Sequence, residues 1–229
     1  MPAAAITRRA IQLDAFGNAD VLQLREEQIA PPAQGEVQLR QIAMGFNYID
    51  IYQRSGKYPL SLPTGLGHEA AGIVEAVGPD VTDFSVGDRV IYMNAGIGAY
   101  TDRRNVDATK LARIPDGVDE LTAVAVFFKA MTAEYLLRKT YVVKPGDVVL
   151  IHAAAGGVGQ VLSRWGKALG AYVIGTAGSE DKCEIARKAG CDHAINYSQD
   201  GWVERVVEAS GGRKAHVVYD SVGGHTFLG

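Results

Sequence analysis

The chain has 229 residues, of which 47% are hydrophobic and 21% charged, and its formal net charge is −3. This composition is typical of a globular protein with one large domain or two small ones. Lys and Arg form no long block, so we expect no nucleic-acid partner, and the pairs Arg8-Arg9 and Arg103-Arg104 are predicted to lie on solvated faces. The N-terminal residues lack a signal-peptide pattern and no apolar run is long enough to cross a bilayer, so we expect no membrane partner and a cytoplasmic location.

Two cysteines, Cys183 and Cys191, occur in the whole sequence. Their spacing fits neither a zinc knuckle nor a disulfide framework. We therefore predict two free thiols in a reducing compartment.

The first half of the chain has the apolar patterns of β-strands, separated by Gly, Pro and an Asn-Ala-Asp segment. The predicted strands are residues 8–13, 21–26, 36–44, 68–78 and 87–93. A short helix is predicted over 47–56, ended by Gly56. Because strands and helices do not alternate here, an antiparallel barrel-like or mixed β domain is favoured.

From about Leu121 the pattern changes to helices that alternate with short apolar strands. Residues 120–140 predict two helices or one bent helix. The segments that follow are strands at 148–154, 172–177, 193–197 and 216–224, and helices at 157–170, 180–190 and 201–212. This alternation is the signature of a parallel sheet with helices on both faces, so the fold class is α/β.

A glycine-rich turn separates the first of these strands from the helix after it. It reads Ala154-x-Gly156-x-x-Gly159, the dinucleotide-binding fingerprint with Ala at its first position. Gly156 would let the backbone approach a pyrophosphate at the helix N-terminus, and Gly159 would let the helix pack closely on the strand. The alternative is a glycine turn that only suits tight packing.

The residues after the second strand indicate which dinucleotide is bound. An NAD site usually carries Asp or Glu there, whereas this chain has Thr-Ala-Gly-Ser over 176–179. Ser179 can donate a hydrogen bond and Lys182 can supply a charge-assisted bond to a 2′-phosphate, which contributes about 1.5–3 kcal/mol. We therefore predict NADPH, with a solvated, surface Lys182 as the alternative.

Residues 65–78, GLGHEAAGIVEAVG, resemble the zinc alcohol dehydrogenase signature of the medium-chain dehydrogenase/reductase superfamily. Residues 45–72, 136–147 and 217–224 are similar to its NADPH:quinone oxidoreductase (zeta-crystallin-like) branch. The resemblance implies an N-terminal GroES-like, β-rich catalytic domain over 1–127 and a doubly wound Rossmann domain over 128–229. It also implies a homodimer for the full-length protein. Four strands are present where a doubly wound fold has about six, so the chain is expected to be C-terminally truncated and its Rossmann domain incomplete.

In the zinc branch, a Cys, the His of the GHE motif and a further Cys hold the catalytic metal. His68 stands in the histidine position here, but Asn47 stands in that of the first cysteine, and no cysteine lies near Phe128-Lys129. One imidazole is too few ligands for a stable zinc site, so no metal is predicted. His68 is predicted to be a satisfied polar residue, bonded to Asp50.

The resemblance further implies a set of site residues. Asn47, Tyr52 and Tyr58 would line the nicotinamide and substrate cleft, where Tyr52 could donate to the acceptor oxygen, although both tyrosines could instead pack the β domain. The residues implied to bind the cofactor are Asn47, Lys129, Thr132, Gly156, Gly157, Val158, Gly175, Ser179, Lys182 and Tyr197.

These features together predict a reductase that passes hydride or electrons from NADPH to a quinone or conjugated enone without a metal. A conjugated acceptor spreads the developing charge over its own π-system and does not need a Lewis acid. Two alternatives stay open: a relative of the zinc-type alcohol dehydrogenases, and a non-catalytic binding or crystallin-like protein.

Overall fold

The computed structural model describes residues 5–224 and 226–227, so residues 225, 228 and 229 of the predicted second domain lie outside the described part. The chain divides into two compact units, Met1–Phe128 and Lys129–Gly229. No helix of the described residues is both long and apolar enough to cross a membrane.

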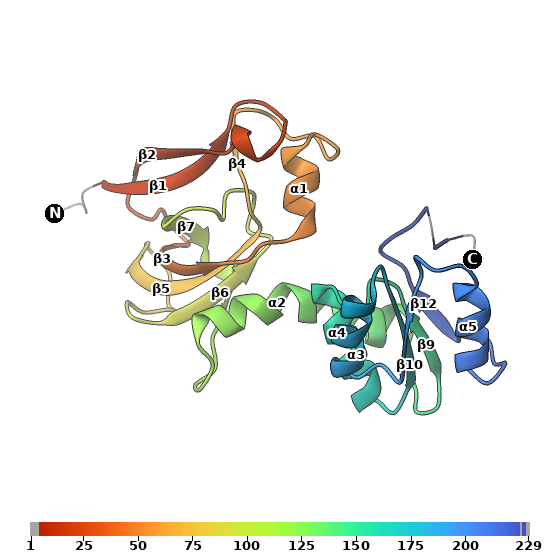
Figure 1. Ribbon diagram of the computed structural model, residues 1–229. Helices are drawn as coiled ribbons and strands as arrows, with labels where there is room; N and C mark the ends of the chain where they lie inside the picture. Colours follow the sequence, from red (N-terminus) through yellow and green to blue (C-terminus); the bar gives the residue numbers. More distant parts are fainter. Residues whose placement is uncertain (1–4, 225, 228–229) are drawn as a thin grey trace. The chain divides into compact units, whose positions relative to one another are not determined.

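The first unit is built from two antiparallel sheets, as the strand patterns predicted (Figure 1). The larger sheet has the order β7-β3-β5-β6-β8 and the smaller one the order β2-β1-β4. The strands are β1 Ile6–Leu13, β2 Gln23–Ile29, β3 Glu36–Met44, β4 Thr64–Gly65, β5 Glu69–Val77, β6 Arg89–Met93, β7 Arg103–Asp107 and β8 Leu111–Arg113. The helical segments are η1 Ala19–Val21, α1 Tyr48–Arg54 and η2 Ala108–Lys110.

The central strands β3 and β5 form the core of the larger sheet. Val37, Leu39 and Val74 are buried there with Val90 and Tyr92 of β6. Residues at alternate positions of a strand face the same side, so this alternation gives the sheet one buried apolar face.

Strand β7 was not predicted from the sequence, and neither were the contacts of Arg104 within it. The Arg104 guanidinium donates to the carbonyl of Ala95 at 2.7 Å and to the hydroxyl of Tyr92 at 3.2 Å. It also lies 5.4 Å from the centre of the Tyr92 ring. The prediction that Arg103-Arg104 lies on a solvated face was therefore wrong for Arg104, because its half-buried side chain ties the loop after β6 to the sheet.

The second unit contains a parallel sheet of order β11-β10-β9-β12. Counted from β9, this is the order 3-2-1-4, the beginning of a doubly wound dinucleotide-binding sheet. The strands are β9 Val148–Ile151, β10 Tyr172–Ala177, β11 His193–Asn196 and β12 Val217–Tyr219. The helices are α3 Gly157–Ala168, α4 Glu180–Lys188 and α5 Trp202–Ala209. The α/β class and the partial Rossmann sheet are confirmed.

Helices cover both faces of this sheet. Leu162 of α3 and Ala186 of α4 pack with Val149 and Val173 on one face, and Trp202 of α5 packs on the other, beside Leu150 and Ile174. Figure 1 shows the same arrangement, with α3 and α4 on one side of the strands and α5 on the opposite side.

The predicted bend in residues 120–140 is a change of helix type. Helix α2 spans Glu120–Tyr135 and is followed by a π-helical turn, η3, over Leu136–Thr140. The carbonyl of Leu136 accepts a hydrogen bond from the Tyr219 hydroxyl at 2.9 Å, which holds this turn against β12.

Candidate functional site

The amino end of α3 lies directly after β9, at the carboxyl edge of the parallel sheet. The first hydrogen bond within the helix runs from Gln160 N to Gly156 O at 2.9 Å. The N–H groups of Gly157, Val158 and Gly159 precede it, at the positive end of the helix dipole. Such an end is suited to bind an anion.

At each glycine of this turn, an added side chain would meet a close neighbour. A Cβ on Gly159 would lie 2.4 Å from the carbonyl oxygen of Ala153, so Gly159 allows the close packing of helix on strand that the motif predicted. A Cβ on Gly156 would lie 3.1 Å from the same oxygen. At Gly157 the neighbour is the Lys129 side chain, whose Cγ would be 3.3 Å away.

The backbone of the turn holds an unusual conformation at Ala153, which has a φ of +52°. This left-handed conformation is costly for a residue with a Cβ. Hydrogen bonds on both sides hold it: Gly156 N donates to Ala153 O at 2.8 Å, and Ala154 N donates to Thr176 O at 3.0 Å. The turn is thus fixed to β10 as well as to β9.

The carboxyl end of β10 brings together two of the residues predicted around a 2′-phosphate. Ser179 begins α4 as its N-cap, and its hydroxyl accepts from the backbone N–H of Lys182 at 3.4 Å. A Cβ on Gly178 would lie 3.1 Å from the Tyr197 hydroxyl, so the Tyr197 ring stands beside the residue before Ser179. Lys182 is exposed on the first turn of α4.

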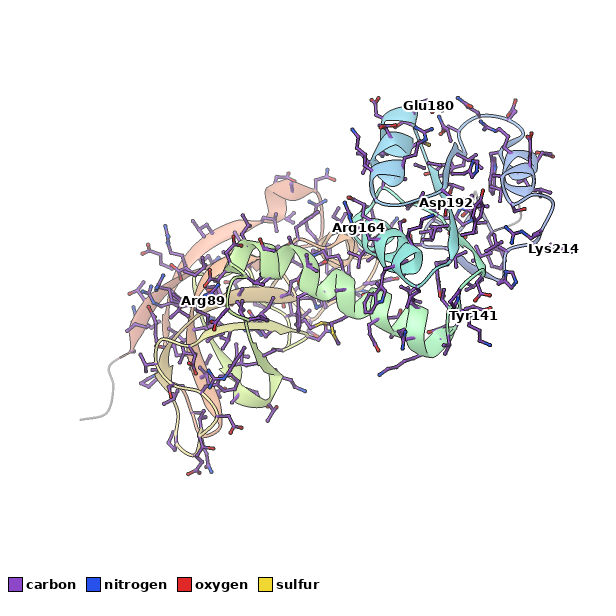
Figure 2. All side chains as sticks on the ribbon, turned by 90° about the horizontal axis from the view of Figure 1, so that it is seen from below. Arg89, Tyr141, Arg164, Glu180, Asp192 and Lys214 are labelled. Atoms are coloured by element: carbon purple, nitrogen blue, oxygen red, sulfur yellow. The ribbon has the colours of Figure 1, made fainter. Side chains whose placement is uncertain are left out.

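The acidic residue nearest to this place, Glu180, is engaged elsewhere. Its carboxylate accepts from the Gln199 amide at 3.2 Å and lies 3.9 Å from the Arg187 guanidinium. Figure 2 shows the labelled Glu180 at the amino end of α4. Residues 176–179 themselves contain no carboxylate, which fits the predicted preference for a phosphorylated ribose.

Gly175 lies within β10, where packing accounts for its lack of a side chain. A Cβ there would come within 2.7 Å of both the Ala154 Cβ and the Cys191 Sγ. Its contact with a cofactor remains a prediction. Cys183 and Cys191 are free and buried, as predicted for free thiols, and burial raises the pKa of both.

In the first unit, a polar cluster surrounds the start of α1; it comprises Asn47, Asp50, Gln53, His68, Glu69 and Tyr100. Asn47 is buried, and its Nδ2 donates to Glu69 Oε1 at 2.9 Å. Glu69 Oε2 accepts from the backbone N–H of Phe128 at 3.2 Å. A Cβ on Gly45 would lie 2.1 Å from Glu69 Oε1, so a glycine is needed there to make room for the carboxylate.

His68 has a different partner from the one predicted. Its Nε2 lies 2.9 Å from Gln53 Oε1, whereas the nearest oxygen of Asp50, Oδ1, is 4.0 Å away. The prediction of a bond to Asp50 was therefore wrong, because one further turn of α1 brings the longer Gln53 side chain to the imidazole.

Tyr52 and Tyr58 are neighbours, with ring centres 5.3 Å apart, and Tyr48 adds a third ring 5.1 Å from Tyr52. The Lys57 ammonium lies 5.3 Å from the centre of the Tyr52 ring. Tyr58 is 54% exposed and Tyr48 66% exposed. The three rings form an aromatic group in which Tyr48 and Tyr58 are exposed and Tyr52 is half-buried.

Lys129 and Thr132, predicted beside the nicotinamide ribose, lie one helical turn apart in the second half of α2. The stem of Lys129 runs past Gly157, at the start of α3. Both side chains are half-buried.

The residues at the positions of the zinc ligands do not suit a metal. Within residues 5–224 and 226–227, no three His, Cys, Asp or Glu side chains are grouped so that they could hold an ion. Asn47 directs an N–H, which cannot ligate a cation, at Glu69. Sequence reasoning missed Gln53 and Tyr100 as members of the cluster, because neither belongs to a recognised motif. Glu69 belongs to the GHE motif, but its bond to Asn47 was not predicted.

Comparison with known proteins gives consistent matches over nearly the whole chain. Residues 33–116 match the alcohol dehydrogenase GroES-like domain, and residues 157–228 match the family described as zinc-binding dehydrogenase. The chain is 48% identical to a quinone oxidoreductase of Pseudomonas aeruginosa and 49% identical to quinone oxidoreductase 1 of Escherichia coli. Each alignment covers 95% of this chain and 67% of the relative.

A solved structure of E. coli quinone oxidoreductase complexed with NADPH matches with a TM-score of 0.91 and 48% identity, over 94% of this chain and 66% of that one. A 2-haloacrylate reductase of Burkholderia is 46% identical, over 92% of this chain and 65% of its own length. The chain thus spans about two thirds of the length of these relatives.

Proposed function

The chain belongs to the quinone oxidoreductase family of the medium-chain dehydrogenase/reductase superfamily, and we propose that it takes part in the NADPH-dependent reduction of a quinone or conjugated enone. The observation that carries the proposal is the amino end of α3, which follows β9 in a sheet of order 3-2-1-4. Dinucleotide pyrophosphates bind at this place in doubly wound sheets.

The residues of the turn fit such a cofactor. Any side chain on Gly159 would collide with backbone, and the N–H groups of Gly157 and Val158 precede the first bonded turn. We assign the pyrophosphate to Gly156, Gly157 and Val158. When bound, NADPH would supply a hydride from its nicotinamide ring.

The 2′-phosphate is assigned to Ser179, Lys182 and Tyr197. The E. coli relative, which was solved with NADPH, supports the choice of the phosphorylated cofactor. So does the engagement of Glu180 with Gln199 and Arg187, because a carboxylate held by these partners adds little repulsion toward a phosphate. Lys129, Thr132 and Gly175 remain proposed contacts.

The acceptor is assigned from the chemistry of the polar cluster and the aromatic group. Without a Lewis acid, an acceptor must delocalise the charge that hydride addition creates, as a quinone or conjugated enone does. Tyr52 and Tyr58 offer rings on which a planar acceptor can stack, and their hydroxyls can donate to its oxygen. The Burkholderia relative, named a 2-haloacrylate reductase, is consistent with a conjugated acceptor.

Two further expectations concern the setting of the reaction. We propose that the full-length protein is a homodimer that acts in the cytoplasm. Sedimentation equilibrium of the full-length protein tests the first, and fractionation of the source cells tests the second.

The proposal is tested by titrating the protein with NADPH and with NADH. Lys182→Ala should weaken NADPH binding by about ten- to a hundredfold, the loss of a charge-assisted bond of about 1.5–3 kcal/mol, and leave NADH binding unchanged. Lys188→Ala, at the other end of α4, is the matched control and should change neither. Equal binding of both cofactors by the wild type, unaffected by Lys182→Ala, would contradict the phosphate assignment.

The zinc-type alternative is tested on the same preparation. Elemental analysis that found one zinc per chain, lost in His68→Ala, would favour an alcohol dehydrogenase chemistry instead. We expect no stoichiometric zinc, since Asn47 and Glu69 bond each other.

A further inference from the structure

One buried carboxylate oxygen in the polar cluster is left without a hydrogen bond. Asp50 is 1% exposed, and its Oδ2 accepts from Asn47 N at 2.8 Å and from the Tyr100 hydroxyl at 2.7 Å. Its other oxygen, Oδ1, is buried and has no hydrogen-bond partner among the described residues. A buried, unpaired acceptor of this kind is costly and calls for a function.

The group that faces this oxygen is an imidazole. His68 Nε2 lies 4.0 Å from Asp50 Oδ1 and 2.9 Å from Gln53 Oε1. The carboxylate can only accept hydrogen bonds, so the arrangement is satisfied when Nε2 carries a hydrogen. With a hydrogen on Nε2, the nitrogen that can gain and then donate a second proton is Nδ1. A tenth of the His68 side chain is exposed.

Other titratable groups of the polar cluster surround this imidazole. The Asp50 carboxylate faces His68 from α1, and Glu69 follows His68 in the chain. Tyr100 adds no opposing charge, because burial, together with the hydrogen bond to Asp50, raises the pKa of its hydroxyl far above the usual range.

The cluster also joins His68 to a residue already assigned to the site. Asp50 accepts from the backbone N–H of Asn47, and Glu69, the residue after His68, accepts from the Asn47 amide. The imidazole itself is held to α1 by Gln53, one turn beyond Asp50.

We propose that His68 is the proton donor of the reaction and that two residues of α1 position its imidazole: Gln53, which bonds Nε2, and Asp50, whose unpaired Oδ1 faces it. The inference rests on the proposed function. Hydride addition leaves the reduced acceptor as an oxyanion; the N–H bond at His68 Nδ1 breaks, an O–H bond forms on the acceptor, and His68 recovers its proton from water. One hydride and one proton are thereby added, the requirement of a two-electron reduction.

The positioning of His68 is tested without turnover, by ¹⁵N–¹H NMR of the imidazoles. In the neutral state His68 should be the Nε2–H tautomer, and Asp50→Asn should raise the share of the Nδ1–H tautomer, because an amide N–H in place of Oδ1 can donate to Nε2. A neutral Nδ1–H tautomer in the wild type, or tautomer populations unchanged in Asp50→Asn, would overturn the positioning of His68. This readout stands even if NADPH binding, and with it the proposed function, fails.

Proton donation is tested with a series of substituted 1,4-benzoquinones whose hydroquinones differ in acidity. His68→Gln should lower kcat about 100-fold for the acceptor with the most basic product, and progressively less for acidic products. The fall in wild-type kcat with rising pH should disappear in this variant. His193→Gln, at an exposed histidine of β11, is the matched control and should behave as wild type.

Three outcomes would overturn proton donation. They are an equal loss for all quinones, an unchanged pH profile in His68→Gln, and a wild-type protein that binds NADPH but reduces no quinone. The last outcome would overturn the proposed reduction as well, whereas the first two leave it intact.

Discussion

The polar cluster around α1 and the glycine turn before α3 are held together by different interactions. In the polar cluster, long side chains from distant parts of the chain bond each other, such as Asn47 with Glu69 and Asp50 with Tyr100. In the glycine turn, side chains are missing, and backbone approaches backbone at Gly159. The stability of the polar cluster should therefore depend on its hydrogen-bond acceptors, whereas the glycine turn should be destabilised by added side-chain volume.

The largest effect is expected from volume added to the turn. Gly159→Ala places a Cβ 2.4 Å from Ala153 O and 2.7 Å from Ala154 Cα, both backbone atoms of a turn tied to two strands. Such overpacking should destabilise the second unit by about 3 kcal/mol. Urea unfolding followed by circular dichroism measures this.

The matched control for Gly159 lies in the same helix. A Cβ on Gly166 would be 3.4 Å from Val173 Cγ2, an ordinary contact, so Gly166→Ala should be neutral or should stabilise by up to about 1 kcal/mol through helix propensity. Equal destabilisation by the two substitutions would contradict the packing role of Gly159.

The next largest effect concerns the acceptor in the polar cluster. Glu69→Leu removes the buried carboxylate that accepts from Asn47 Nδ2, so it should destabilise the first unit by about 2 kcal/mol. Glu75→Leu, farther along β5, is the control, because the half-exposed pairs of Glu75 with Arg40 and Arg103 contribute less than about 1 kcal/mol. A larger fall in Tm for Glu75→Leu than for Glu69→Leu would contradict this prediction.

A smaller, opposite effect is expected at Ala153. Ala153→Gly relieves the left-handed conformation at φ +52°, while it increases the entropy of the unfolded chain. The two terms oppose each other and should leave a stabilisation of about 0.5 kcal/mol, measurable as a higher urea midpoint. A lower midpoint would mean that this conformation is not strained.

The smallest effect is a pH dependence at the start of α2. Arg89 lies 2.7 Å from Glu120 and holds the pKa of that carboxyl below its ordinary value of 4.5 (Figure 2 labels Arg89). A carboxyl with a lowered pKa in the folded state stabilises the fold above its unfolded pKa, and this contribution is lost as the pH falls through the folded value. Glu120→Gln should therefore lower the Tm at pH 7, with the difference from wild type shrinking below about pH 4.5. A Tm difference between wild type and Glu120→Gln that stays constant from pH 7 to pH 3 would contradict this role of the Arg89–Glu120 pair.

The same contrast explains how much the sequence could predict. The glycine turn was identified because its residues follow one another between a strand and a helix, and local order is what a motif records. Gln53 and Tyr100 were missed because their partners are 15 and 50 residues away, and no local pattern encodes such pairs. Strand β7 was missed for a related reason: Arg103 and Arg104 look like surface residues until the partners that bond them are known.

The central claim is that the amino end of α3 and the start of α4 hold NADPH. ¹⁵N-labelled protein titrated with NADPH tests it most directly, through the amide shifts of each residue. The largest changes should fall on Gly157, Val158 and Gly159, and NADH should reproduce them while it leaves Ser179 and Lys182 unmoved. Saturating NADPH that shifts other residues but none of the α3 amides would contradict the claim.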